Sequence, residues 1–399
     1  MSAINIQIQD IRSLLKNLNL AADNFQVDIR QESSRLEAIE AAKKLVSALE
    51  KPEDVIFKHT YCTGQVFASR LAVELGIFRI LDADGEKTSK QLAEMTNADQ
   101  ALIVRIMRVL IPLDFVGEMG PETYYPRPLT KTLANPLMEG TTKFIYETMN
   151  VFAKEIEYFK SNGFKNPTDP NNGPFQFAAG VNIGIFEWLD AHPDVFKSFH
   201  DYLEIDRGSR PSWVDWFPVQ QQLLNGFTGS DKDVLLVDIG GSRGHDLATF
   251  RARFKTIPGR LILQDQPHVI DAIEALDEKI ERQKHDFFTP EPIEGARAYY
   301  MKFILHDWSD EYSIPILRNI ATAMRKGYSK LIIEEFVLPD EKCPELSAMW
   351  DLIVMNFISG MERSETQWKH LLESAGLKVM KVWRPPGDGQ GIIEAELQD

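Results

Sequence analysis

Hydrophobic residues recur at three- and four-residue spacing along the first part of the chain, as in "LEAIEAAKKLVSALE". This spacing places apolar side chains on one face of a helix, so residues 1–55 are predicted to form a mostly polar helical segment. The stretch "ASRLAVELGIFRILD" that follows predicts a further, more apolar helix.

Residues 56–140 carry the order of elements that is typical of a winged helix. Two helical stretches are followed by a short strand pair, "FVGEM" and "TYYPRP", and Thr88 or Ser89 is the expected cap of the first of the two helices. A winged helix binds DNA in some proteins and serves as a dimerisation or lid module in others. This segment has no cluster of Lys and Arg, which favours a dimerisation domain.

Residues 141–232 are predicted to form a helical linker that lines the substrate. A loop rich in Asn, Pro and Gly, "NGFKNPTDPNNGPF", interrupts the helices here. Aromatic residues then recur through "FEWLDAHPDVFKSFHDYLE". They have two interpretations, which are core and interface packing or the wall of a pocket for a flat substrate.

From residue 233 to residue 399 short apolar strands alternate with helical stretches. The strands include "VLLVDIG", "RLILQD", "ARAYYMKFIL" and "SKLIIEEFVL". Continuous apolar strands that alternate with helices indicate a parallel sheet covered on both faces, so we expect a doubly wound, Rossmann-like α/β domain. The tail, "GLKVMKVWRP" and "GIIEAEL", predicts a terminal hairpin at the sheet edge.

Charge and composition narrow the range of partners. The 399 residues carry a formal net charge of −15, which argues against nucleic acid and against anionic membrane as partners. Cys62 and Cys343 stand far apart and outside any metal-like spacing, so neither a metal site nor a disulfide framework is expected. With no signal peptide or membrane span indicated, we expect a soluble cytoplasmic protein that acts on a small molecule.

Polar residues stand where successive strands of the predicted sheet end. In an open α/β sheet, ligands bind beyond the carboxyl ends of the strands. The first strand ends in an acid and a glycine turn, the second in an acid about twenty residues further on, and the third in "KHDFF". The candidate ligand-binding residues are Asp238, Gly240, Gly241, Gly244, Asp265, Asp286 and Phe287.

The turn "DIGGSRG" by itself fits a dinucleotide, a nucleoside sulfonium or no ligand. Its glycines at 240, 241 and 244 do not match the G-x-G-x-x-G spacing of dinucleotide-binding proteins. An acid before the turn would repel a pyrophosphate but suits the cationic sulfonium or amino group of S-adenosylmethionine. Together with the acids at the next two strand ends, this favours a nucleoside.

The fourth strand ends in "MKFILHDW" and supplies a candidate base. Because side chains alternate along a strand, Lys302, Ile304 and His306 are expected to point the same way, with His306 at the carboxyl end. A histidine there can reach a substrate that lies over the sheet. The alternative is a loop histidine bonded to Asp307 or Asp310.

Five segments resemble one enzyme family. "LLVDIGGSRGHD", "LILQDQPHVI", "KHDFF", "GARAYYMKFILHDWSDE" and "SKLIIEEFVLP" are similar to the caffeate/flavonoid type of class I O-methyltransferases, and more closely to their fungal secondary-metabolite relatives. The resemblance covers nearly the whole chain and implies S-adenosylmethionine as cofactor and a homodimer joined through the N-terminal region. The third consecutive glycine of the family is Ser242 here.

The resemblance implies site residues position by position. They are Gly240 at the cofactor turn, Asp265 at the ribose, Asp286 and Phe287 at the adenine, Trp308 beside it, Lys302 at the methionyl end, His306 as base, and Glu335 and Glu362 as the acids that flank the base. Rough alignment adds Met149, Asn150, Phe186 and Met355 as substrate residues, with core packing as the alternative for each.

The implied reaction is methylation of a hydroxyl, most simply a phenol, on an aromatic or polyketide-type secondary metabolite. One of Glu335 and Glu362 would hold the second ring nitrogen of His306. The alternatives are that Glu334 and Glu335 are surface acids and that Glu362 pairs with Arg363. An S-adenosylmethionine-binding pericyclase or dehydratase is the second functional hypothesis. A winged-helix regulator and an NAD-dependent oxidoreductase are disfavoured by the acidic chain and the glycine spacing.

Overall fold

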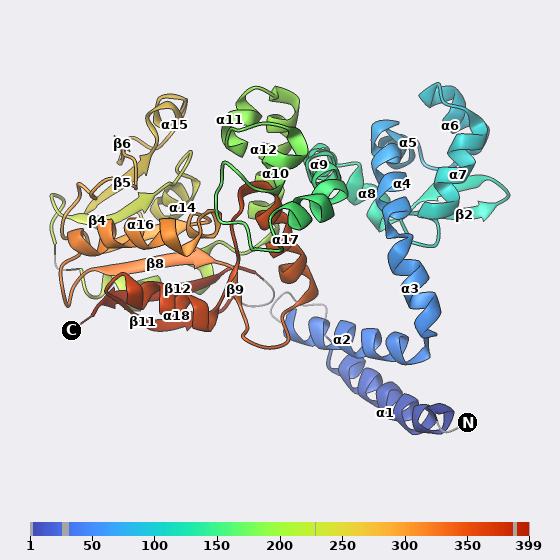
Figure 1. Ribbon diagram of the computed structural model, residues 1–399, viewed down its shortest axis with the longest axis horizontal. Coiled ribbons are helices and arrows are strands. Elements are labelled where there is room, and N and C mark those ends of the chain that lie inside the picture. Colours follow the sequence, from blue (N-terminus) through green and yellow to red (C-terminus); the bar gives the residue numbers. More distant parts are fainter. Residues whose placement is uncertain (1–2, 26–31, 228, 386–388, 399) are drawn as a thin grey trace. The chain divides into compact units, whose positions relative to one another are not determined.

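The computed structural model describes residues 3–25, 32–227, 229–385 and 389–398, and the chain divides into two units (Figure 1). The smaller unit comprises Met1–Glu147 and Pro193–Asp206, and the larger comprises Thr148–His192 and Arg207–Asp399. No helix in the described part of the chain combines the length and the apolar character needed to cross a membrane.

The smaller unit is mainly helical. Its elements are α1 (Ala3–Asn24), α2 (Glu32–Leu49), α3 (Pro52–Thr60), α4 (Cys62–Glu74), α5 (Ile77–Asp84), β1 (Lys87–Thr88), α6 (Ser89–Thr96), α7 (Gln100–Leu110), β2 (Val116–Gly120), β3 (Thr123–Pro126), α8 (Pro128–Leu133) and most of α12 (Pro193–Ser209). The long helix α9 (Pro136–Ser161) begins here and continues into the larger unit.

The predicted winged helix is present in the smaller unit. Thr88 caps α6, where its hydroxyl accepts from the Gln91 backbone N–H and the Gln91 side chain accepts from the Thr88 N–H. Asp99 caps α7, and β2 and β3 form the expected antiparallel pair. The two-residue strand β1 adds a third strand beside β3. Apolar faces of α4, α5 and α7 close the core of this unit.

The larger unit contains the Rossmann-like sheet. Its elements are α10 (Pro174–Ala179), α11 (Ile185–Asp190), α13 (Trp213–Trp216), a π-helical turn (Gln220–Leu224), β4 (Val234–Ile239), α14 (His245–Arg253), β5 (Arg260–Asp265), α15 (Pro267–Asp271), β6 (Ile280–Lys284), β7 (Ala298–Lys302), a 3-10 turn (Leu305–Asp307), α16 (Asp310–Ala323), β8 (Lys330–Glu335), β9 (Val337–Leu338), α17 (Glu345–Ile358), β10 (Arg363–Ser364), α18 (Glu365–Ser374), β11 (Leu377–Trp383) and β12 (Gly391–Leu397).

The main sheet has the order β11-β12-β8-β7-β4-β5-β6. Strands β4 to β8 run parallel, and β12 pairs antiparallel with both β8 and β11. The expected α/β fold and the terminal hairpin are therefore confirmed. The strand order reverses direction between β4 and β7, which is where open α/β sheets bind their ligands.

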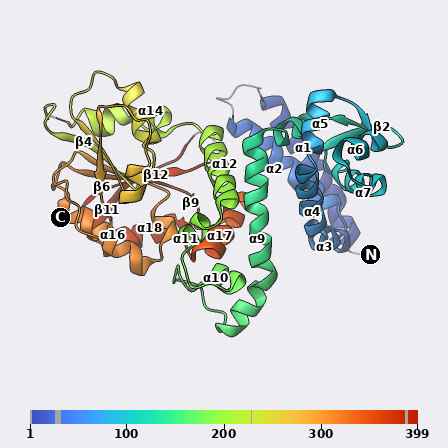
Figure 2. The same ribbon diagram turned by 90° about the horizontal axis from the view of Figure 1, so that it is seen from above.

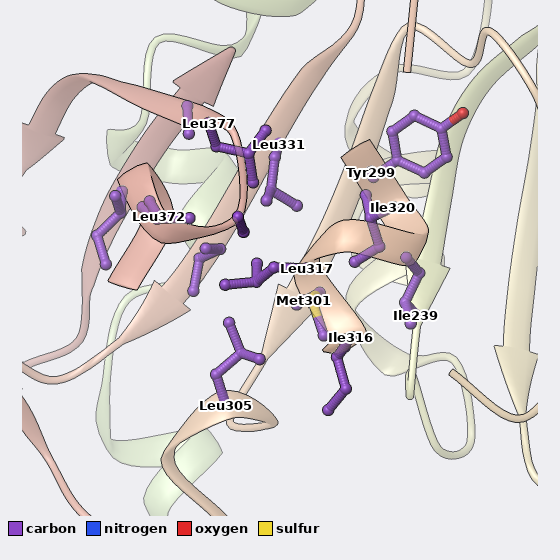
Figure 3. Packing of buried hydrophobic residues seen from close by; sticks show 14 of the residues in the cluster. Ile239, Tyr299, Met301, Leu305, Ile316, Leu317, Ile320, Leu331, Leu372 and Leu377 are labelled. Carbon is purple, nitrogen blue, oxygen red and sulfur yellow. The ribbon is translucent and has the colours of Figure 1, made fainter. Parts of the chain in front are cut away.

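Both faces of the main sheet are covered, as its continuous apolar strands predict. On one face Tyr299 and Met301 of β7 pack with Leu317 of α16 and Leu372 of α18 (Figure 3). On the other face Tyr300 packs with residues of α13 and α14. Figure 2 shows α14 on one side of the sheet and α16 and α18 on the other. The period of two along each strand thus sorts side chains between two cores.

Candidate active site

The glycine turn after β4 leaves no room for a side chain at Gly240 or Gly241. Gly240 has a φ of 71°, and a Cβ there would lie 2.5 Å from the Ile304 Cδ1 atom. A Cβ on Gly241 would lie 2.5 Å from the carboxyl carbon of Asp238, which is buried beneath the turn. Ser242, the next residue of the turn, adopts a left-handed φ of 52°. The turn therefore presents bare backbone at the sheet edge, as close approach to a ligand requires.

Asp265 lies beside this turn at the end of β5. One carboxylate oxygen accepts from the Ser242 backbone N–H at 2.8 Å and the other from the Gln266 N–H at 2.7 Å. Burial raises the pKa of Asp265, while these two hydrogen bonds lower it. Each carboxylate oxygen has two lone pairs, so acceptor capacity remains for a diol. The residue predicted for the ribose is therefore held next to the glycine turn.

An aromatic cluster follows β6 and involves more residues than the sequence indicated. The rings of Phe287 and Phe288 have centroids 6.2 and 4.8 Å from the Trp308 ring, and Tyr312 lies 5.8 Å from it. The Asp286 carboxylate accepts from the Phe288 N–H at 3.0 Å and so fixes the loop. Phe288 and Tyr312 are not among the site residues predicted from the sequence. The adjacent phenylalanines of "KHDFF" were a signal for Phe288.

Lys302 ends β7 within a group of acids. Its ammonium lies 3.1 Å from a Glu334 carboxylate oxygen and 3.4 Å from an Asp246 oxygen. Tyr300 donates a hydrogen bond to the other Glu334 oxygen, and burial raises the Glu334 pKa. Sequence reasoning left Asp246 and Glu334 out of the site. The two carboxyl groups of Asp246 and Glu334 outnumber the Lys302 ammonium that they contact, which suits a cationic ligand.

The expected strand from Lys302 to His306 is wrong. Strand β7 ends at Lys302 because Phe303 adopts a left-handed φ of 52°, and Leu305–Asp307 then form a 3-10 turn. The Leu305 side chain points into the core beside Leu317 (Figure 3). Side-chain alternation therefore does not relate Lys302, Ile304 and His306. A tight turn held by a core leucine, rather than a strand, presents the histidine.

His306 is buried among three carboxyl groups. Its Nδ1 atom lies 2.7 Å from Glu362 Oε1 and 3.9 Å from Glu335 Oε2, and its Nε2 atom lies 3.1 Å from Asp307 Oδ1. The Glu335 Oε1 atom accepts from the backbone N–H groups of Ile304 and Leu305, both at 3.0 Å. The two acids thus have different partners, since Glu362 bonds the ring and Glu335 bonds the turn that carries it.

The alternatives for these acids do not fit the structure. Glu334 and Glu335 are 2% and 0% exposed, so neither is a surface acid. Glu362 does not pair with Arg363, whose guanidinium binds Asp310 instead. The contact between His306 and Asp307 that was expected for a loop histidine is present, but on the ring nitrogen opposite Glu362.

The carboxyl groups control the charge of the imidazole. Burial lowers the His306 pKa, but Glu335, Asp307 and Glu362 together raise it to about 10. Burial raises the pKa of Asp307 to about 6 and that of Glu335 to about 7. The ligand atoms of His306, Glu335 and Glu362 lie within 4.8 Å of one another, a spacing that also suits a metal ion. Their hydrogen bonds to the ring and the turn favour acid–base chemistry instead.

Two family descriptions match the chain over most of its length. An O-methyltransferase domain matches residues 170–378, and an O-methyltransferase dimerisation domain matches residues 61–136. This chain belongs to the O-methyltransferase family. Among its relatives, O-methyltransferase mpaG of Penicillium brevicompactum is 37% identical over 96% of this chain and 98% of its own length. O-methyltransferase asqD of Emericella nidulans is 37% identical over 82% and 85%, respectively.

Solved structures share this fold over nearly the whole chain. The LepI complex with SAM has a TM-score of 0.84 at 26% identity, covering 100% of both chains. OxaC in complex with SAH and oxaline has a TM-score of 0.83 at 27% identity, covering 98% of this chain and 100% of OxaC. A structure described as a pericyclic reaction enzyme has a TM-score of 0.83 at 26% identity, with the same coverage.

The four predicted substrate residues of this methyltransferase lie on three helices of the larger unit. Met149 and Asn150 belong to α9, Phe186 to α11 and Met355 to α17. The Phe175 ring of α10 lies 5.2 Å from the Trp188 ring of α11 and 6.1 Å from the Phe357 ring of α17, so aromatic packing joins α10, α11 and α17. Phe186 is 53% exposed. A role in substrate binding stays a prediction for all four.

Proposed function

We propose that this O-methyltransferase transfers a methyl group from S-adenosylmethionine to a phenolic hydroxyl of an aromatic or polyketide-type secondary metabolite, with His306 as general base. The observation that carries the proposal is the buried His306–Glu362 pair at the edge of the sheet that also bears the glycine turn and Asp265. Histidine held by a carboxylate is a common arrangement for general-base catalysis.

The residues present fit the cofactor. The bare backbone at Gly240 and Gly241 allows close approach, and Asp265 has lone pairs for the two ribose hydroxyls. The aromatic cluster of Phe287, Phe288 and Trp308 offers apolar faces for an adenine, with Asp286 at its edge. When bound, S-adenosylmethionine supplies an electrophilic methyl group on a sulfonium. The acids around Lys302 match the positive charge of such a ligand.

His306 activates the acceptor by taking its proton. A phenol has a pKa near 10, so only about one molecule in a thousand is ionised at neutral pH. Glu362 holds the Nδ1 atom, which leaves Nε2 to face the acceptor. Asp307 Oδ1 lies 3.1 Å from Nε2, so the acceptor hydroxyl takes the place of that carboxylate. His306 must first release its own proton, since three carboxyl groups raise its pKa to about 10.

The two flanking acids then have separate tasks. We assign Glu362 to fixing the ring and its tautomer, because its oxygen lies 2.7 Å from Nδ1. Glu335 stabilises the imidazolium from 3.9 Å and holds the Ile304 and Leu305 amides of the turn. Together they favour the protonated ring that forms as the phenol loses its proton.

The direct test is incubation with S-adenosylmethionine labelled in its methyl group and a panel of fungal phenols and polyketides. Label in an acceptor, with one equivalent of S-adenosylhomocysteine formed, supports the proposal. The single methyl transferred to oxygen is located by mass spectrometry and by its NMR shift. Label that stays in the cofactor while an acceptor is converted contradicts methyl transfer.

A pericyclase or dehydratase is the second candidate, because a structure described as a pericyclic reaction enzyme shares this fold at a TM-score of 0.83. Such an enzyme would use the bound cofactor as a fixed charge and would keep its methyl group. His306, Glu335 and Glu362 favour transfer, since a base that ionises a phenol is what an oxygen nucleophile needs. The labelling experiment separates the two reactions.

We further propose that the protein is a homodimer in the cytoplasm. The dimerisation-domain match supports association through residues 61–136. Large apolar side chains of α3 and α4 are exposed, including Ile56 at 63%, Phe57 at 56% and Phe67 at 53%. A reducing compartment agrees with Cys62 and Cys343, which are both free and exposed thiols. The four-part division at residues 55, 140 and 232 stays a prediction.

A further inference from the structure

The guanidinium of Arg363 is fully buried beside the turn that carries His306. Its Nη1 atom donates to the Leu305 carbonyl at 2.8 Å, and its Nη2 atom donates to the Trp308 carbonyl at 2.7 Å. Its Nε and Nη2 atoms lie 2.9 and 2.8 Å from Asp310 Oδ1. The ring of Trp368 lies 5.3 Å away on α18. Arg363 thus holds both ends of the segment 305–308.

The residues before Arg363 contact the same segment. The Met361 N–H donates to the His306 carbonyl at 2.8 Å, and Glu362 contacts the His306 ring. A Cβ on Gly360 would lie 2.2 Å from the His306 carbonyl oxygen, so only glycine permits this approach. Segments 360–363 and 305–308, which follow α17 and β7 respectively, are therefore joined residue by residue.

We propose that Arg363 is a positioning residue that couples the adenine side of the cofactor site to the histidine base. The proposal rests on the proposed function. The two backbone carbonyls that Arg363 binds, those of Leu305 and Trp308, lie on either side of His306 in the sequence. The side chain of Trp308 packs on Phe288. A cofactor that orders the Trp308 ring would thereby also fix the position of His306 against Glu362.

Arginine suits this task because its planar fork can hold several acceptors in fixed directions. The Leu305 carbonyl accepts from Nη1 and the Trp308 carbonyl from Nη2, while the Asp310 carboxylate lies against Nε and Nη2. Lysine keeps the charge but has a single flexible ammonium, which cannot hold two carbonyls and a carboxylate in this geometry. Arg363→Lys therefore removes the clamp while a cation remains.

The experiment compares Arg363→Lys with Arg318→Lys. Arg318 also donates to a backbone carbonyl, that of Ser374, but far along α16 from the site. Two readouts need no acceptor substrate. One is the affinity for S-adenosylhomocysteine by calorimetry, and the other is the pH titration of the His306 ring by NMR with labelled histidine, assigned with His306→Ala. Thermal unfolding of each variant serves as the measure of folding.

Arg363→Lys is expected to weaken S-adenosylhomocysteine binding by about fivefold or more, because Trp308 loses its carbonyl anchor. The His306 ring is expected to titrate at lower pH than in wild type, because Glu362 moves away from the imidazolium. Arg318→Lys should change neither. A folded Arg363→Lys protein with wild-type values in both readouts would overturn the proposal, as would equal changes in Arg318→Lys.

Asp310→Asn supplies a second variant if Arg363→Lys does not fold. The Asp310 side chain is 61% exposed, so its replacement loosens the clamp without emptying a buried site. An S-adenosylhomocysteine affinity about twofold weaker and a His306 ring that titrates at lower pH support the coupling. Wild-type values in both readouts overturn it. Failure of the proposed function is seen separately, as wild-type protein that binds no S-adenosylhomocysteine or transfers no label to any acceptor.

Discussion

At the scale of single residues, the site depends on which atoms contact the imidazole of His306. Glu362 bonds Nδ1 directly, while Glu335 is more distant and bonds the turn. The sequence indicated both acids but did not show which one orients the ring. That distinction depends on a difference of about one ångström between two side chains that converge from separate elements, which no local pattern encodes.

His306→Ala is expected to lower turnover at least about a hundredfold, because general-base catalysis contributes about 10² to 10⁴ in rate. Affinity for S-adenosylmethionine should stay near wild type. The measurement is initial-rate kinetics together with calorimetry. Raising the pH should partly restore turnover, since hydroxide then ionises the phenol. Asp265→Asn is the matched control. Its affinity for S-adenosylmethionine should fall, because an amide side chain has an oxygen that accepts hydrogen bonds but a nitrogen that only donates them. Full activity of His306→Ala would remove His306 from the mechanism.

Glu335→Gln tests the electrostatic role of the second acid. The His306 pKa is raised to about 10, and the base is active when neutral, so activity should rise with pH through the alkaline range. Removing the Glu335 charge lowers the His306 pKa, so the acidic limb of the pH–rate profile should move to lower pH. The maximal rate should fall, because the imidazolium loses a stabilising charge. An unmoved limb would show that Glu335 only supports the turn.

At the scale of elements, the sequence predicted the strands well and the turn after β7 poorly. The run "YYMKFIL" is apolar except for Lys302, and nothing in it marks the left-handed Phe303 that ends the strand. That conformation is uncommon for a bulky residue, and tertiary contacts impose it here. The Leu305 side chain packs in the core, and the Glu335 carboxylate accepts hydrogen bonds from the backbone N–H groups of Ile304 and Leu305. Periodicity alone cannot anticipate contacts with residues thirty positions away.

The turn is expected to depend on its core leucine. Leu305→Ala removes a fully buried side chain from the cluster of α16 and α18, which should lower the free energy of unfolding by about 2–5 kcal/mol. Denaturant unfolding measures the change. Leu346→Ala on α17, where the side chain is 58% exposed, is the control and should change stability by no more than about 0.5 kcal/mol. Equal effects of the two would contradict the anchoring role of Leu305.

At the scale of the whole molecule, charge and family together limit the partners. A net charge of −15 disfavours nucleic acid as a partner. The winged helix matches an O-methyltransferase dimerisation domain, which gives it a role that does not involve DNA. The sequence predicted both the fold class and the N-terminal winged helix, because helix caps, strand alternation and glycine turns are local signals. The residues that line the substrate could not be predicted in this way, because contacts between helices that are distant in sequence leave no local signal.

The protein is expected to be a homodimer at micromolar concentration, measured by light scattering coupled to gel filtration. The exposed apolar side chains of α3 and α4 supply the surface to be covered. Phe57→Glu places a charge among them and should shift the protein toward monomer. Glu94→Lys on α6, where the side chain is 66% exposed, serves as a charge-changing control on a different helix from these apolar side chains. A monomeric wild type would contradict the assignment.

The place of β12 in the sheet has a consequence for synthesis of the protein. Residues 391–397 form an interior strand, between β8 and β11, although both of these neighbouring strands leave the ribosome before it (Figure 1). Until they emerge, β8 has an open edge with unpaired backbone groups, which is a template for aggregation. Translation at about 5–20 residues per second leaves that edge exposed for seconds. The nascent chain should therefore need chaperone protection until β12 pairs, while the N-terminal winged helix can fold earlier.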